Sequence, residues 1–150
     1  KGSLLVGEKN KFRLSVSGIT FISDGVSLWQ WNIEQRQVLI KSIEDLSSAL
    51  HPSELLFKYL NCRAISVREE QWKKKKVYVL TLDPAKYGDQ FKAMEVWLSA
   101  KDYSPVRLFT VDHIDNASQY EISNLKIVKK TTLADFTFKS SKEIDEVDMR

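Results

Sequence analysis

The sequence lacks the features of several common protein classes. It has one cysteine, Cys62, so the chain cannot form an internal disulfide. No apolar run approaches the roughly 18 residues that a membrane-spanning helix requires, and no signal-peptide hydrophobic region is present. Seven phenylalanines, five tyrosines and four tryptophans, together with many Val and Ile, give enough apolar burial to exclude a disordered chain.

The charge balance is also modest. Lys and Arg number 23 and Asp and Glu 20, which leaves a net charge of +3, too small to indicate nucleic-acid binding by itself. Hydrophobic residues make up 43% of the chain, slightly below the usual share of about 45–50%. A length of 150 residues predicts one domain, covering residues 1–150.

Short β-type apolar runs separated by turn residues dominate most of the chain. Asp24-Gly25 lies between two such runs and predicts a hairpin with a type I′ turn, because Gly accepts a positive φ. The predicted strands are residues 4–6, 12–16, 19–22, 26–31, 37–40, 64–68, 77–82, 93–99, 106–114 and 120–128, with a last short strand marked by Phe136 and Phe138 and a polar tail over 142–150.

A helical zone is predicted over residues 43–60, as two short helices or one bent pair. Ser42 caps its start, and Pro52 suits the first position of its second part. The two parts form one helical insert in an antiparallel sheet of about ten strands, which must curl or close. The second part carries one apolar stripe of Leu55, Leu56, Tyr59 and Leu60.

No catalytic or metal-binding pattern stands out. His51 and His113 are the only histidines, and neither has a metal-ligand spacing. The acids around His113 read as solvated charges near a turn, and Cys62 as a small, semi-buried side chain. The sequence therefore predicts no enzyme, no cofactor and no metal.

The run Lys73-Lys74-Lys75-Lys76 after Trp72 is the most basic feature. One interpretation is a solvated hairpin tip, where lysines discourage pairing between sheet edges. The other is a phosphate-contacting patch with an aromatic platform, which docks on anionic lipid or on an acidic partner. The sequence leaves both interpretations open.

Several predicted strands are apolar on both faces, as in Trp29-Gln30-Trp31 and Val96-Trp97-Leu98. Both faces are then covered, or one face lines an apolar cavity. Aromatic residues lie in almost every predicted strand and in the helical zone. Core packing explains any one of them, but together with a curved sheet they indicate a container for an apolar ligand.

The segment over residues 22–29 resembles the S-D-G-x-x-L-W hairpin of the LolA family, the periplasmic carriers of outer-membrane lipoproteins. Further segments follow in the family's order, so the resemblance spans nearly the whole chain. They are residues 2–12, similar to the G-x-L-x-V…P-N-x-F strand pair; 52–56, similar to the P-x-x-L-L helix; 80–86, similar to the L-x-P-K strand end; and 133–138, similar to the closing F-x-F segment.

This resemblance implies an incomplete, strongly curved antiparallel β-barrel with a short helical lid and an apolar cavity for lipoprotein acyl chains. It implies a periplasmic monomer that takes lipoproteins from an inner-membrane transporter to an outer-membrane acceptor, without nucleic-acid partners. Phe12 matches the family's cavity-mouth aromatic. The candidate lipid-binding residues are Phe12, Leu14, Phe21, Trp29, Trp31, Leu55, Leu56, Tyr59, Val96, Leu98, Phe109 and Tyr120.

The chain departs from the family pattern in two places. Glu8 and Lys9 stand where the family has Arg and Pro, and that Arg latches the lid by donating to lid carbonyls, which an ionised Glu cannot do. The family also begins with an amphipathic helix and a strand, and residues 1–150 are expected to be a LolA-like domain that lacks both. Two alternatives on the same fold are a regulatory domain that senses envelope lipoproteins and a membrane-anchored lipoprotein acceptor.

Overall fold

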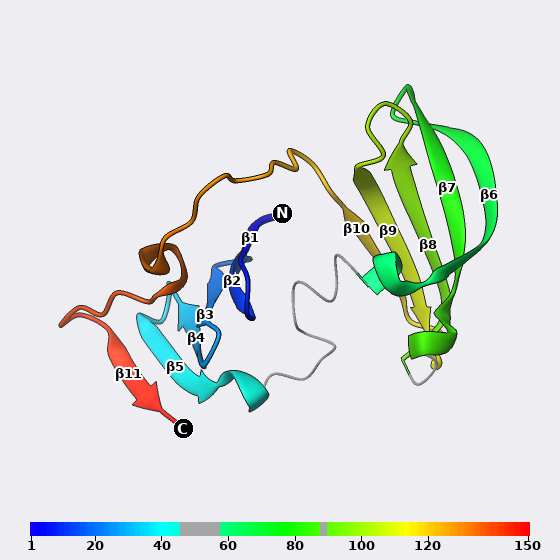
Figure 1. Cartoon of the computed structure of the whole chain (residues 1–150). Coiled ribbons are helices and arrows are strands. Elements are labelled where there is room, and N and C mark those ends of the chain that lie inside the picture. The colour runs from blue at the N-terminus through cyan, green and yellow to red at the C-terminus, as the bar shows by residue number, and fades with distance from the viewer. Residues whose placement is uncertain (46–57, 88–89) are drawn as a thin grey trace. The chain divides into compact units, whose positions relative to one another are not determined.

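The computed structural model describes residues 1–45, 58–87 and 90–150. The chain divides into two compact units, each built on one sheet: unit 1 is Lys1–Leu55 with Val128–Arg150, and unit 2 is Leu56–Ile127 (Figure 1). The mainly β prediction is confirmed. Within the described ranges, no helix is long and apolar enough to cross a membrane.

Unit 1 holds a six-stranded sheet in the order β1-β2-β3-β4-β5-β11. The first five strands form an antiparallel meander, whereas β11 pairs with β5 in parallel (Figure 1). The sheet is thus built from the two ends of the chain. Its strands are β1 (Gly2–Val6), β2 (Lys11–Val16), β3 (Ile19–Asp24), β4 (Ser27–Asn32), β5 (Gln37–Ser42) and β11 (Asp145–Asp148).

The predicted hairpin at Asp24-Gly25 is confirmed, but its turn type is wrong. Of this pair, only Gly25 has a positive φ, 97°, whereas type I′ needs two such residues. Instead, the two turn residues are Gly25 and Val26, since Ser23 pairs with Leu28, and Asp24 Oδ1 accepts from the backbone N–H groups of Val26 at 2.9 Å and Ser27 at 2.8 Å. Gly25 is required there, since a Cβ would lie 2.3 Å from the carbonyl oxygen of Lys9.

Unit 2 holds a five-stranded antiparallel sheet in the order β10-β9-β8-β7-β6. The strand predicted over residues 64–68 extends over ten residues, since its partner β7 continues the ladder up to the lysine turn. The strands are β6 (Arg63–Trp72), β7 (Lys75–Asp83), β8 (Phe91–Ser99), β9 (Pro105–Asp112) and β10 (Ala117–Glu121), with the 3₁₀ helices η3 (Lys58–Asn61) and η4 (Pro84–Tyr87) beside them.

Three predictions near the C-terminus are wrong. The strand expected over 120–128 ends at Glu121, and the apolar Ile127 beyond it is 97% exposed. Phe136 lies in the 3₁₀ helix η5 (Leu133–Phe136) instead of a strand, and its ring is buried. The polar tail contains β11, which joins the sheet through its backbone.

The helical zone is seen only at its margins. Ser42 caps the 3₁₀ helix η1 (Ile43–Asp45), since its Oγ accepts from the backbone N–H of Glu44 at 3.3 Å. Residues 46–57, with Pro52, Leu55 and Leu56, lie outside the described residues, so the helical lid stays a prediction. The incomplete barrel also stays a prediction, because each of the two sheets is open.

Candidate functional site

One face of the unit 1 sheet gathers three of the predicted lipid-binding residues. Leu14 pairs with Phe21 across β2 and β3, and side chains alternate along a strand, so Phe12 shares this face. Phe12 is buried, whereas Leu14 and Phe21 are half-buried. We call it the Phe12 face; the register adds to it Leu4, Val6, Leu28 and Leu39.

The opposite face of this sheet carries Trp29 and Trp31, which pair with Ile22 and Thr20. We call it the Trp31 face. The segment over 133–138 packs here: the Phe138 ring meets Trp31 edge-on at 5.7 Å. These two predicted lipid-binding residues therefore lie on the face that the chain's own C-terminal segment covers.

Arg13 fastens this C-terminal segment to the sheet. Its Nε donates to the carbonyl oxygen of Asp135 at 2.9 Å, and its Nη2 to that of Thr137 at 3.4 Å. The Phe136 ring lies so close to Gly7 that a Cβ there would come within 2.7 Å of it. Two hydrogen bonds from the Arg13 guanidinium to backbone carbonyls and the packing of the buried Phe136 ring thus hold the segment on the sheet.

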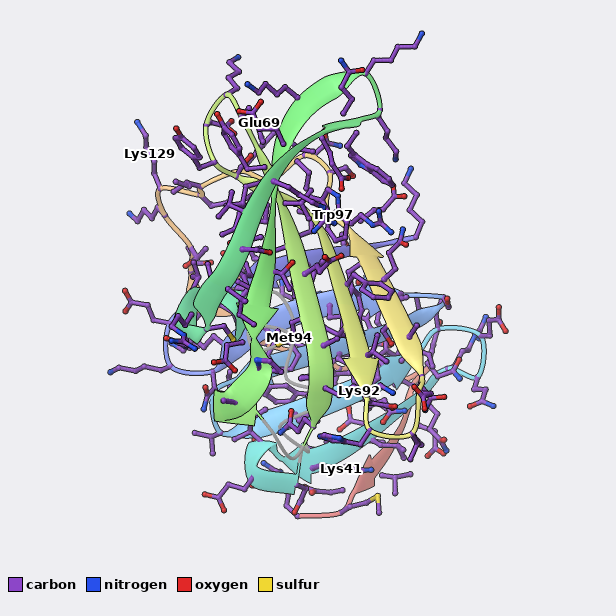
Figure 2. All side chains as sticks on the ribbon, turned by 90° about the vertical axis from the view of Figure 1, so that its right-hand side faces the viewer. Lys41, Glu69, Lys92, Met94, Trp97 and Lys129 are labelled. Atoms are coloured by element: carbon purple, nitrogen blue, oxygen red, sulfur yellow. The ribbon has the colours of Figure 1, made fainter. Side chains whose placement is uncertain are left out.

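In unit 2, four further predicted residues gather on one face of the sheet. Val96 lies in a buried cluster with Leu82, Met94 and Leu108. We call this the Met94 face. Figure 2 labels Met94 and also Trp97, which the strand register places on the opposite face of the sheet. The side chains packed against the cluster include Tyr59, Cys62, Leu80, Phe91, Leu98 and Tyr120.

Tyr59 reaches this cluster from η3, and desolvation raises the pKa of its phenol above the ordinary value. Cys62 is half-buried beside it, as the sequence predicts. The Met94 face therefore joins side chains from η3 and from four strands in one apolar surface.

The other face of the unit 2 sheet is closed by polar and aromatic side chains. We call it the Trp97 face; Phe109 lies here, opposite Glu95. The Arg107 guanidinium stacks on the rings of Trp72 at 4.6 Å and Trp97 at 4.2 Å. Such contacts join a cation to the negative faces of the indoles, so this face resembles a closed surface more than a ligand surface.

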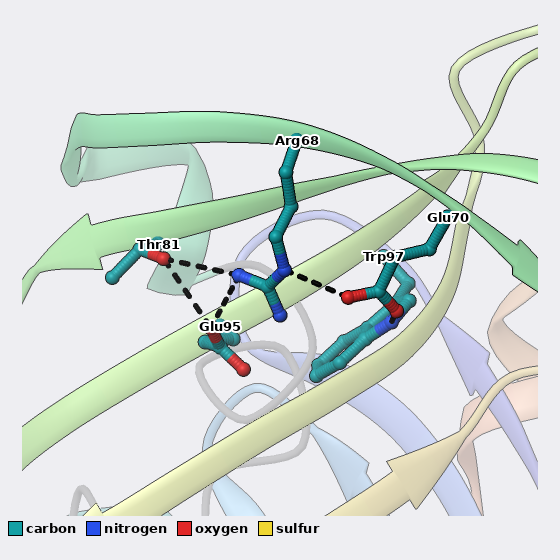
Figure 3. Close-up of polar contacts among 5 residues, drawn as sticks. All are labelled: Arg68, Glu70, Thr81, Glu95 and Trp97. Carbon is teal, nitrogen blue, oxygen red and sulfur yellow. Dashed lines mark hydrogen bonds and ion pairs between the residues drawn. The ribbon is translucent and has the colours of Figure 1, made fainter.

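A polar cluster continues along the Trp97 face (Figure 3). Arg68 donates to Glu70 at 2.7 Å and to Glu95 at 2.8 Å, while the Trp97 indole donates to Glu70 at 3.3 Å. The hydrogen bonds from Arg68 and Trp97 hold the pKa of Glu70 below its usual value, and those to Glu95 and Glu70 raise the pKa of Arg68. All these charges are paired, so the cluster orients Trp97 and provides no unpaired acid or base for catalysis.

The structure therefore divides the predicted lipid-binding set among four faces. Phe12, Leu14 and Phe21 share the Phe12 face, and Tyr59, Val96, Leu98 and Tyr120 share the Met94 face. Leu55 and Leu56 lie outside the described residues. Sequence reasoning missed the companions that only strand pairing brings in: Leu4, Leu39, Met94 and Leu108.

Other candidate sites hold little chemistry. Two surface hollows of about 410 and 370 Å³ lie in unit 1, and neither is lined by Phe12, Leu14 or Phe21. In the part of the chain that the structure describes, no three His, Cys, Asp or Glu side chains are placed to hold a metal ion. Asp112 accepts from the backbone N–H groups of Ile114 and Asn116, which confirms the turn interpretation around His113.

The comparisons with known proteins agree with this architecture. A family model described as outer membrane lipoprotein carrier protein LolA matches residues 1–139. The chain belongs to the LolA family. All the segments that resemble the family in sequence fall inside this match, and LolA proteins are carriers, which suggests a lipoprotein-binding role for this chain.

The curated proteins contain no match to the chain. Among solved structures, 22 chains match. One is the crystal structure of an uncharacterized conserved protein from Thermus thermophilus, with a TM-score of 0.55 and 15% identity over 98% of this chain and 80% of that one. At this identity the likeness shows the fold alone.

Proposed function

We propose that this LolA-family protein is a periplasmic carrier that binds lipoprotein acyl chains and shuttles lipoproteins from the inner to the outer membrane. The observation that carries the proposal is the difference between the two faces of each sheet. Side chains of the same unit close the Trp31 and Trp97 faces, which hold three of the twelve predicted lipid-binding residues, while seven gather on the Phe12 and Met94 faces.

The energetics suit an acyl ligand. Burial of each CH₂ group contributes about 0.8 kcal/mol, so a carrier gains affinity from broad apolar contact instead of from directed hydrogen bonds. Leu14 and Phe21 are half-buried and retain surface for such contact. Apolar walls without fixed polar partners also allow the chains to leave again.

The proposed partners are those of a carrier: an inner-membrane transporter that supplies lipoproteins and an outer-membrane acceptor that receives them. The family's Arg latch is absent, because Glu8 stands at that position and is exposed in the turn between β1 and β2. Arg13 makes guanidinium–carbonyl bonds of the same chemistry, but on the C-terminal segment.

A release assay from inner-membrane vesicles tests the proposal. The native protein is expected to bring lipoproteins into the supernatant. A regulatory domain that only senses lipoproteins would not release them. Leu14→Gln should lower the released amount at least fivefold, because a polar amide would replace half-buried apolar contact on the Phe12 face. Leu5→Gln is the matched control, since Leu5 pairs with Arg13 on the other face and is also half-buried. No release by the native protein, or equal loss in both variants, would overturn the proposal.

A further inference from the structure

The four consecutive lysines lie at one end of the unit 2 sheet. Trp72 pairs with Lys75, so Lys73 and Lys74 form the two-residue turn between β6 and β7. The turn between β8 and β9 lies at the same end (Figure 1), where the backbone N–H of Ala100 donates to the carbonyl of Lys76 at 3.1 Å. This contact brings in a fifth lysine; we call Lys73, Lys74, Lys75, Lys76 and Lys101 the basic end.

Carboxylates neutralise this end only in part. Lys73 pairs with Glu121, and Lys76 pairs with Glu69 at 2.8 Å. Lys74 and Lys75 make no ion pair with any described residue and are exposed. Five lysines thus stand with three carboxylates, those of Glu69, Asp102 and Glu121, which leaves a positive excess on the surface.

The turn carries this charge at the expense of its own geometry. Lys73 and Lys74 have φ angles of 49° and 64°. These angles lie in the left-handed region, which is unfavourable for residues other than Gly, Asn and Asp. The equivalent two-residue turn of unit 1, Ser17-Gly18, has positive φ angles too, but places a glycine there. The lysine turn therefore places two cations at positions where the backbone favours Gly, Asn or Asp.

Aromatic side chains accompany the lysines. Tyr103 is 66% exposed and stacks on Tyr78 at 6.0 Å, with Lys76 Nζ 5.7 Å from the Tyr78 ring. Tyrosine is favoured at the boundary between a bilayer and water, because its ring is apolar and its hydroxyl is polar. Trp72 is held by Arg107, so we expect contact at headgroup level without deep insertion.

We propose that the basic end docks the protein on a bilayer surface that contains anionic phospholipid. Long, mobile lysine side chains around an exposed tyrosine match the diffuse negative charge of a headgroup layer. This role is distinct from acyl binding, because none of the candidate acyl-binding residues belongs to the basic end. It does not depend on the carrier function.

The test is co-sedimentation of the full chain with vesicles of phosphatidylglycerol and phosphatidylcholine, and with vesicles of phosphatidylcholine alone. The native protein is expected to bind the anionic vesicles more tightly, and less so as salt is added. The variant Lys73→Asn with Lys74→Gly removes two charges and gives the turn its preferred residues. Each lysine near an anionic surface contributes about a fivefold gain in affinity, so binding should fall about 30-fold while the protein stays folded.

The matched control is Lys9→Asn with Arg36→Gly in unit 1. Both residues are exposed cations with positive φ angles, 54° and 50°, so this variant removes the same charge and relieves the same backbone strain. Its vesicle binding should stay within about twofold of the native protein. Equal loss in the two variants would assign binding to net charge and overturn the proposal. So would no binding of the native protein to anionic vesicles, which would favour an acidic protein partner instead.

Discussion

The two sheets close their second face in different ways. Unit 1 uses a distant part of the chain: the segment over 133–138 lays its aromatic rings on the Trp31 face, and Arg13 bonds across 122 residues of sequence. Unit 2 uses side chains of the sheet itself, with Arg107 between two indoles and Arg68 between two carboxylates. Unit 1 therefore depends on one segment, whereas unit 2 spreads its closure over many small contacts.

The largest expected effect follows from removal of the buried ring in the unit 1 segment. Phe136 is 2% exposed, so Phe136→Ala should lower the free energy of unfolding by about 3–5 kcal/mol. Leu133→Ala, in the same turn but 63% exposed, should cost below about 0.5 kcal/mol. Urea unfolding measures both. Similar values for the two would mean that the segment does not close unit 1.

Arg13 provides the next effect. Arg13→Gln removes two charge-assisted hydrogen bonds to backbone carbonyls, so we expect a loss of about 1–3 kcal/mol in urea unfolding. Lys11→Gln is the control, because Lys11 lies two residues before Arg13 on the same face, and this substitution also removes one positive charge. If the control is as unstable as Arg13→Gln, general charge and not the bonds to Asp135 and Thr137 stabilises the segment.

Unit 2 should respond more weakly to a single change. Arg107→Gln keeps polarity but loses the stacking on Trp72 and Trp97, at an expected cost of about 1–2 kcal/mol. Near-ultraviolet circular dichroism should show a changed tryptophan signal, while Arg63→Gln, at an exposed ion pair, should leave it unchanged. A loss as large as that of Phe136→Ala would remove the contrast between the units.

The smallest effect concerns pH. The hydrogen bonds from Thr132 lower the pKa of Asp135 below its ordinary value of 3.8. A carboxyl whose pKa is depressed by folding stabilises the native state above its unfolded pKa, and that stability is lost as the pH falls through the folded pKa. Unfolding curves below about pH 4 should therefore depend less on pH in Asp135→Asn than in the native protein. Parallel pH profiles for the two proteins would contradict this role.

The errors in the predicted fold have physical causes. Phe136 and Phe138 alternate as in a strand, but Asp135 Oδ2 accepts from the backbone N–H and the hydroxyl of Thr132, which starts a 3₁₀ turn instead. The T-x-x-D spacing could have indicated this turn. The strand β11 gave no such signal, because its acidic segment joins the sheet through the backbone edge of β5, with one side-chain hydrogen bond from Gln37 to Asp145.

The candidate site was only partly accessible to prediction. A two-residue turn at Asp24-Gly25 pairs Phe21 with Leu28, whereas the structure pairs it with Gln30. Both registers put Trp29 and Trp31 on the face opposite Phe21, so the sequence held enough information to separate them. The grouping of Tyr59 with Val96 could not be predicted, because it depends on how η3 packs on a sheet formed later in the chain.

The most direct test of acyl binding on the Phe12 and Met94 faces is the lipid content of protein extracted from bacterial periplasm. Native mass spectrometry would compare the native chain with Phe21→Ser and Phe109→Ser, two half-buried phenylalanines that lie on the Phe12 face and the Trp97 face. We predict bound acylated peptide or phospholipid on the native chain and on Phe109→Ser, and its loss from Phe21→Ser. A native chain free of lipid, or equal lipid on the two variants, would contradict the assignment of acyl binding to these faces.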